Sequence, residues 1–142
     1  MKSLRLLVIL STSMLFISGN LLAKQDYKSF FEEDGIEFSY KWKHSKFLKK
    51  DSPIILFLKI ENANDYHASV EFTVDYFWKS IRHSSSDPQI ACIKANKSAK
   101  GKIRKLTFEK GKLSDEDILS DDFILEISDF EALKVLNCKR KK

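Results

Sequence analysis

The sequence predicts an all-β protein, folded as a two-sheet antiparallel β-sandwich of about seven strands. Several separate segments alternate apolar and polar residues with a period of two, which is the pattern of strands that bury one face. Polar, turn-forming segments separate these strands at short intervals, and no long segment shows the helical period. A small closed barrel is the second architecture that fits this pattern.

The first residues, MKSLRLLVILSTSMLFISGNLLA, have the order of a signal peptide. Lys2 and Arg5 precede an apolar run, and Ala23 provides the small residue expected at a cleavage site. We therefore predict a cleaved signal peptide at 1–23, a single domain at 24–142, and a periplasmic or secreted protein. The alternative is an uncleaved membrane anchor, but polar residues interrupt the apolar length that a span needs. No integral span is expected after cleavage.

The first predicted strand follows a short polar and aromatic lead, residues 24–34. In residues 36–43 the inward positions are aromatic or aliphatic, and the outward positions are Glu, Ser and Lys. Pro53 can open the second strand, because a proline at a strand's first residue removes no central hydrogen bond. The inward residues expected from these two strands are Ile36, Phe38, Tyr40, Trp42, Leu56, Leu58 and Ile60.

The third predicted strand, residues 70–79, alternates again, with Val70, Val74 and Trp78 among the inward positions. Between the second and third strands lies ENANDY, residues 61–66, which is rich in residues that bond nearby backbone groups. We therefore expect the two strands to form an antiparallel hairpin.

Four more strands are expected, at 89–94, 102–108, 122–128 and 131–138, with polar turns such as ANKSAKG between them. One short helical turn is predicted near 114–119. Ser114 is a suitable N-cap, and the acidic residues 115–117 favour the positive end of a helix. The same acids, with 121–122, could collect oxygens around calcium, but the order of an EF-hand loop is missing.

Cys92 and Cys138 are the two cysteines of the chain, and both follow the predicted signal peptide. In an oxidising compartment they are expected to form a disulfide that joins the strand at 92 to the C-terminal strand. The chain-entropy model gives such a bridge about 4 kcal/mol of stability. Two buried free thiols are the alternative.

The segments LKIENANDY and VEFTVDY resemble the hairpin of small exported bacterial immunoglobulin-like β-sandwich proteins, many of which have no assigned function. The resemblance covers about residues 36–138 and implies an immunoglobulin-like fold and an exported location. It transfers no catalytic residue. Both tryptophans, Trp42 and Trp78, precede Cys92, so the antibody-type arrangement of a tryptophan between two bridged cysteines is absent.

Local signs of catalysis are missing from the sequence. His44, His67 and His83 have no metal-ligand spacing, and Ser84–Ser86 beside His83 are better explained as a turn. No nucleophile elbow or phosphate-binding glycine cluster occurs. We therefore predict no catalytic residue, no cofactor, no metal ligand and no enzymatic activity.

The remaining signals favour a binding role. Phe57 and Phe77 should point outward from their strands and are the candidate binding surface for an unknown protein or glycan of the cell envelope. The chain without residues 1–23 has 23 basic and 20 acidic residues, with no nucleic-acid-binding signature. The short basic tail, residues 139–142, could weakly contact an anionic surface. The leading expectation is a non-enzymatic binding or accessory module; an inhibitor of a secreted hydrolase and a small secreted hydrolase are the alternatives.

Overall fold

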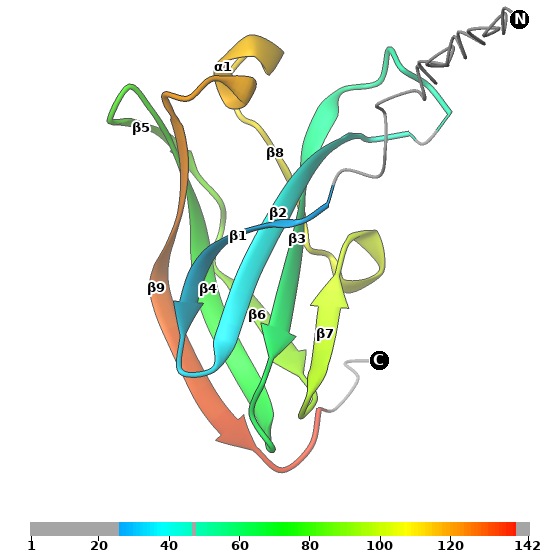
Figure 1. The fold of residues 1–142 in the computed structure, drawn as a ribbon, viewed down its shortest axis with the longest axis vertical. Coiled ribbons are helices and arrows are strands. Elements are labelled where there is room, and N and C mark those ends of the chain that lie inside the picture. Colours follow the sequence, from blue (N-terminus) through cyan, green and yellow to red (C-terminus); the bar gives the residue numbers. More distant parts are fainter. Residues whose placement is uncertain (1–25, 47, 139–142) are drawn as a thin grey trace, which may run out of the picture.

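The computed structural model describes residues 26–46 and 48–138 of the 142-residue chain. These residues form two antiparallel sheets packed face to face with one short α-helix, which confirms the predicted fold class (Figure 1). The predicted signal peptide, 1–23, and the basic tail, 139–142, lie outside the described residues. Within the described part, no helix is long and apolar enough to cross a membrane.

The first sheet is built around β3 and is called the β3 sheet here. Strand β2 pairs with the full length of one edge of β3, and β1 pairs with β2. The other edge of β3 is shared by two short strands, β7 and β8, which pair with its two ends. The strands are β1 (Lys28–Glu33), β2 (Ile36–His44), β3 (Ile54–Asn62), β7 (Lys97–Lys100) and β8 (Thr107–Glu109).

The second sheet, the β4 sheet, follows the same plan. Its central strand β4 pairs with the long strand β9 on one edge, while β5 and β6 share the other edge. The strands are β4 (His67–Trp78), β5 (Ile81–Ser85), β6 (Gln89–Ile93) and β9 (Phe123–Val135). The two helical elements are the 3-10 turn η1 (Lys102–Arg104) and the helix α1 (Asp115–Leu119).

The core lies between the sheets and is made by the inward residues of the alternating strands. The ring of Phe38 in β2 meets the ring of Phe72 in β4 across the sandwich, with centroids 5.0 Å apart. The predicted inward faces of these strands are confirmed. Side chains that are fully or almost fully buried include Ile36, Phe38, Leu56, Leu58, Ile60, Val70, Phe72, Val74 and Tyr76.

The predicted hairpin between the second and third strands is wrong, because β3 and β4 belong to different sheets. The ENANDY segment crosses from one sheet to the other. Its buried Asn62 donates from Nδ2 to the carbonyl of Ile93 at 3.1 Å and to that of Tyr66 at 2.8 Å. Alternation shows which face of a strand is buried, and two strands that face each other bury the same faces as two that pair. Periodicity could not separate these arrangements.

Nine strands are present among the described residues rather than seven. Strands β1 and β5 were not expected: β1 has two adjacent phenylalanines at a register shift, and β5 is mostly exposed and polar. The predicted turn ANKSAKG contains β7, in which Ala99 is the one buried residue. The predicted strand 102–108 begins instead as η1 and pairs with β3 only from Thr107.

The last two predicted strands are one strand, β9, which ends at Val135 and not at Cys138. Its pairing with β4 shifts register between Glu71 and Thr73. On the β9 side, Asp129 has a positive φ of 51° at this irregularity. A bulge of this kind interrupts the alternation without ending the strand, so the pattern looked like two strands.

The predicted disulfide is present and joins Cys92 in β6 to Cys138, with their Cα atoms 5.5 Å apart. Cys138 lies beyond the end of β9, so the bridge fastens the segment after β9 to the opposite border of the β4 sheet. The cross-link closes a loop across most of the second half of the chain. Such a loop restricts the unfolded chain strongly.

Candidate functional site

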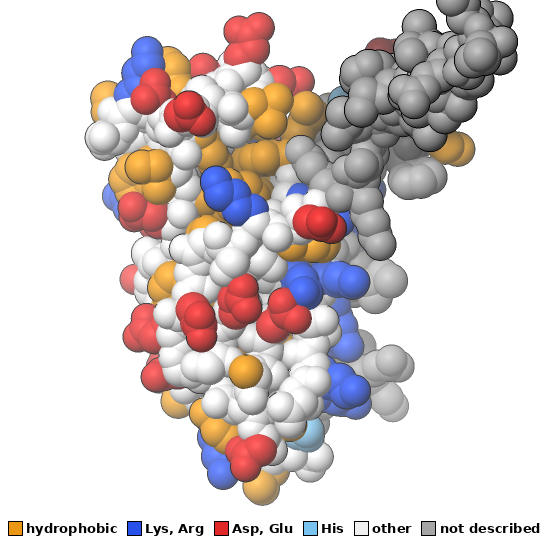
Figure 2. Space-filling view, in the orientation of Figure 1, with side chains coloured by type: hydrophobic (Ala, Val, Ile, Leu, Met, Phe, Trp, Pro, Cys, Tyr) orange, Lys and Arg blue, Asp and Glu red, His pale blue; other side chains and the backbone are white. Residues whose placement is uncertain are grey.

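A recess of about 380 Å³ opens between the two sheets beside α1, and we call it the aromatic hollow. Figure 2 shows hydrophobic side chains gathered in a recess near the top of the molecule, the end at which Figure 1 places α1. The residues that line it are Asp26, Lys28, Tyr40, Lys41, Trp42, Ile118, Leu119, Ser120, Asp121 and Phe123.

One wall of the aromatic hollow comes from β2. Strand β1 pairs with β2 only as far as Tyr40, which lies opposite Lys28. Beyond that point β2 has no partner on this edge among the described residues, and the border of the sandwich is open there. The ring of Phe30 packs edge-on against Tyr40 at 5.3 Å, and Trp42 follows on the same face at 6.4 Å from Tyr40.

The opposite wall comes from α1 and the start of β9. The ring of Phe123 lies 5.6 Å from that of Trp42, so aromatic side chains from both sheets meet at the floor. Ile118 is buried, which fixes α1 on the sandwich, whereas the next residue, Leu119, is 62% exposed at the rim. An apolar side chain is therefore left in contact with solvent beside an aromatic floor.

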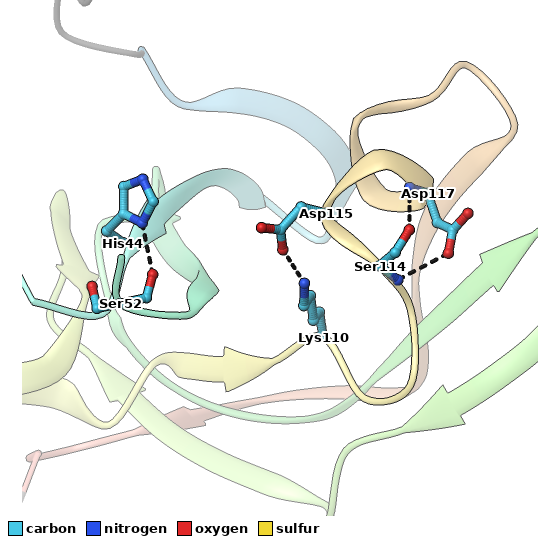
Figure 3. Close-up of polar contacts among 6 residues, drawn as sticks. All are labelled: His44, Ser52, Lys110, Ser114, Asp115 and Asp117. Carbon is cyan, nitrogen blue, oxygen red and sulfur yellow. Dashed lines mark hydrogen bonds and ion pairs between the residues drawn. The ribbon is translucent and has the colours of Figure 1, made fainter. Parts of the chain in front are cut away.

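Helix α1 is held by polar contacts as well as by Ile118. Ser114 Oγ accepts a hydrogen bond from the backbone N–H of Asp117 at 3.1 Å, and the Asp117 carboxylate accepts one from the backbone N–H of Ser114 at 2.9 Å (Figure 3). This capping box confirms Ser114 as the N-cap. Lys110 pairs with Asp115 at the same end. Trp78 Nε1 donates to Ser120 Oγ at 3.3 Å and ties the other end of the helix to β4.

Two polar groups in the floor have unusual surroundings. Trp42 is 7% exposed, and its Nε1 is buried with no hydrogen-bond partner among the described residues. A buried donor without a partner costs free energy. Burial also raises the pKa of the Tyr40 hydroxyl above its ordinary value of 10.0. The Tyr40 hydroxyl is therefore uncharged near neutral pH.

The rim of the aromatic hollow is charged with both signs, from Asp26, Lys28, Lys41 and Asp121. Its lining offers stacking and apolar contact at the floor and polar groups at the edge, a composition common in ligand sites. Within residues 26–46 and 48–138, no three His, Cys, Asp or Glu side chains gather in a way that could hold a metal ion.

The three histidines lie in separate places, and none lines the aromatic hollow. His44 Nδ1 lies 2.7 Å from the Ser52 carbonyl oxygen in the loop between β2 and β3 (Figure 3). His67 Nδ1 accepts a hydrogen bond from the backbone N–H of Ala95 at 3.0 Å. His83 packs against the Trp78 ring at 5.9 Å. Each ring thus has a local structural contact.

The predicted binding-surface residues are not brought together. Phe57 lies in β3 and Phe77 in β4, and by register each points to the outer face of its own sheet. Both are half-buried. The backbone at Gly101 covers part of Phe57, since a Cβ at that position would lie 3.6 Å from the ring. Neither residue lines the aromatic hollow.

Sequence reasoning placed Tyr40 and Trp42 in the core but missed their position at an open border. The missing information was the end of β1 pairing, because β1 itself was not expected. The sequence did contain one sign of an exposed apolar side chain at this border. Ile118 and Leu119 are adjacent in a short helix, which cannot bury both side chains on one face, and Leu119 is the one that is exposed.

Comparisons with known proteins add no name to this architecture. The chain matches no known protein-family model, and neither the curated proteins nor the solved structures contain a significant match. The fold that is shown is a small all-β fold of two antiparallel sheets. The functional interpretation therefore depends on the residues of this chain.

Proposed function

We propose that this protein is a non-enzymatic, exported binding or accessory module of the bacterial envelope, with the immunoglobulin-like organisation that its sequence resemblance implies. The aromatic hollow is the observation that supports the proposal. It combines three aromatic side chains, an exposed leucine and a rim of mixed charge at an open border of a rigid sandwich. Binding residues are commonly carried in this way by loops and borders of a stable scaffold.

The size and composition of the aromatic hollow limit what it can hold. A recess of about 380 Å³ is at the small end of ligand sites, which measure about 300 to 1,000 Å³. One sugar ring, or one large side chain of a partner protein, fits such a volume. Both can stack on aromatic rings and make polar contacts with the charged rim. The proposed partner is therefore a protein or glycan of the envelope.

Affinity capture from the cells that produce the protein tests this proposal. Leu119→Lys places a charge at the rim of the aromatic hollow, and Leu136→Lys is the matched control, because Leu136 is 91% exposed at the opposite end of β9. We expect the unmodified protein and the control to recover the same partner, and Leu119→Lys to recover roughly tenfold less. Equal recovery by all three, or recovery of no partner, would contradict the proposal.

A second candidate function is inhibition of a secreted hydrolase, which the loop between β2 and β3 favours. Ser52 Oγ donates to the carbonyl of Lys49 at 2.7 Å and accepts from the backbone N–H of Lys46 at 3.1 Å, so the loop is braced from within. Leu48 projects from it with 89% of its surface exposed. The test is an assay of hydrolase inhibition by the purified protein. Inhibition that is lost in Leu48→Asp and kept in Leu119→Lys would favour this function over the first.

A further inference from the structure

The outer face of the β3 sheet carries a group of lysines that the aromatic hollow does not explain. Lys41 and Lys43 come from β2, Lys59 from β3 and Lys100 from β7, and we call these four residues the lysine band. Lys59 and Lys100 lie directly opposite each other in the register. Lys41 is opposite Phe57, which lies two positions along β3 from Lys59 and on the same outer face. Side chains from three neighbouring strands therefore meet on one face.

The charges of the lysine band act on one another. Burial, followed by the charges of Lys43 and Lys100, lowers the pKa of Lys41 below its ordinary value of 10.5; Asp26 opposes them with a smaller effect. Like charges directly opposite in a sheet destabilise the pairing. Glu61 pairs with Lys59 at 2.5 Å. The other three lysines have no ion-pair partner among the described residues.

The Tyr27 ring restrains two lysines of the band, and a buried serine lies beneath them. The Lys41 ammonium lies over the Tyr27 ring, 4.1 Å from its centroid, and the Lys59 ammonium lies 5.8 Å from it. Contacts of this kind restrict long, flexible lysine side chains. Ser39 is opposite Lys59 on the same outer face, is 4% exposed, and has an Oγ with no hydrogen-bond partner among the described residues. The band is thus a partly restrained cationic surface above a buried hydroxyl that has no partner among the described residues.

Acidic residues limit the lysine band to a strip across the strands. Glu37 lies opposite Glu61 on one side and opposite Glu32 on the other, so an acidic row borders the band along the same face. Neighbouring strands are about 4.8 Å apart, so the band spans about 10 Å from β2 to β7. In Figure 2 a group of Lys and Arg side chains lies along the right-hand side, where Figure 1 places β7, and a row of Asp and Glu crosses the front of the molecule.

We propose that the lysine band binds a linear anionic polysaccharide, whose acidic groups contact Lys41, Lys59 and Lys100 as the chain runs across the strands. A narrow cationic strip suits a chain, whereas a flat anionic membrane would also face the acidic row beside it. Proteins that bind single-stranded nucleic acid present free aromatic rings to the bases. Here the Tyr27 ring beside the band is covered by Lys41, and the half-buried Phe57 ring on the same face is partly covered at Gly101. The lysine band adjoins the aromatic hollow at Lys41, which belongs to the rim of the hollow, but the proposal does not depend on the function of the hollow.

Calorimetric titration of the purified chain with an oligogalacturonate of about eight sugars tests this proposal, with a neutral glucan of equal length as the reference ligand. The variant Lys41→Gln/Lys59→Gln/Lys100→Gln, called the band variant, removes three of the four charges of the band, and Lys79→Gln/Lys112→Gln/Lys134→Gln removes the same charge from exposed sites elsewhere. We expect binding that weakens with added salt, roughly a tenfold or larger loss of affinity in the band variant, and little change in the control.

Several outcomes would overturn the proposal. A dissociation constant weaker than about 1 mM for the acidic oligosaccharide would show no useful affinity. Equal losses in the band variant and the control would make the effect one of net charge. Tighter binding of an oligothymidylate of similar charge would assign the band to nucleic acid. Tighter binding of phosphatidylglycerol vesicles, lost in the band variant, would assign it to a membrane surface.

Discussion

The outer faces of the two sheets use their charged residues in opposite ways. On the β4 sheet, Asp75 is 3% exposed and accepts hydrogen bonds from Ser128 Oγ at 2.6 Å and from Ser85 Oγ. On the β3 sheet, Lys41 and Lys100 are crowded by other lysines and lack carboxylate partners among the described residues. Asp75 thus joins three strands through its hydrogen bonds, whereas the repulsion among the lysines slightly destabilises the fold. A charge that does not stabilise the fold is a better candidate for contact with a partner.

The contrast also shows why the outer faces were hard to interpret. The same alternation that buries one face of β3 and β4 leaves Lys59 and Asp75 pointing outward. Its cross-strand neighbours decide whether such a side chain is buried in hydrogen bonds that join strands or is left available to a partner. Asp75 has serines beside it on β5 and β9, whereas Lys59 has Lys100.

The largest effect is expected in the layer that both sheets share. Phe38→Ala should lower the free energy of unfolding by about 3 to 5 kcal/mol, because it removes a fully buried ring that contacts Phe72 across the sandwich. Chemical denaturation monitored by fluorescence measures this loss. Phe57→Ala, at a half-buried ring on an outer face, is the control and should be clearly less destabilising. Equal losses would contradict the placement of the core.

Removal of the disulfide should come next in size. The Cys92→Ala/Cys138→Ala variant is expected to lose about 4 kcal/mol of unfolding free energy, because a bridge separated by 46 residues restricts the unfolded chain. Guanidinium denaturation with and without a reductant measures this effect in the variant and the unmodified protein. A reductant that changes neither protein, together with an unchanged midpoint in the variant, would show that the bridge contributes no stability.

The comparison of the two outer faces is tested by truncating one charge on each. Asp75→Ala should cost about 1 to 3 kcal/mol, since it leaves the hydroxyls of Ser85 and Ser128 without their acceptor. Lys41→Ala should cost less than about 1 kcal/mol, because burial and the neighbouring lysines both disfavour its charge and it has no ion-pair partner among the described residues. Thermal and chemical unfolding of the two variants give the result. Equal costs would remove the distinction between the faces.

The pKa of Lys41 gives a pH-dependent form of the same test. Its pKa in the fold is lowered, so the unfolded chain binds more protons between the folded pKa and the ordinary value of 10.5. The destabilisation from its charge is therefore present below the folded pKa and is relieved as pH rises toward 10.5. We expect the free energy of unfolding of the unmodified protein, relative to that of Lys41→Gln, to increase as the pH rises through this range. A constant difference between the two unfolding curves would contradict the crowding of charges.

The smallest effect concerns the cap of α1. A backbone hydrogen bond from Ser114, with one involving its side chain, lowers the pKa of Asp117 below its ordinary value of 3.8. The stabilisation is present above the unfolded pKa and is lost as pH falls through the folded pKa. NMR titration of the Asp117 carboxyl should show this low value, and Ser114→Ala should move it toward 3.8. An identical titration in both proteins would mean that the capping box is not formed in solution.

Sequence reasoning succeeded where one residue type decides the outcome locally. The inward faces of β2, β3 and β4, the Ser114 cap and the Cys92–Cys138 bridge were all predicted and are present. It failed where strands from distant segments had to be paired. The open border at Trp42 depends on where β1 stops, and the lysine band depends on β7 lying beside β3. No local pattern of polar and apolar residues contains that information.

Crosslinking from the rim of the aromatic hollow tests the central claim most directly. A photoreactive phenylalanine analogue at position 119, with the same analogue at position 136 as the control, would be irradiated in the cells that produce the protein. The proposed function predicts one crosslinked envelope partner from position 119 and none of that species from position 136. No product from position 119, or the same products from both positions, would show that the aromatic hollow is not where this protein binds.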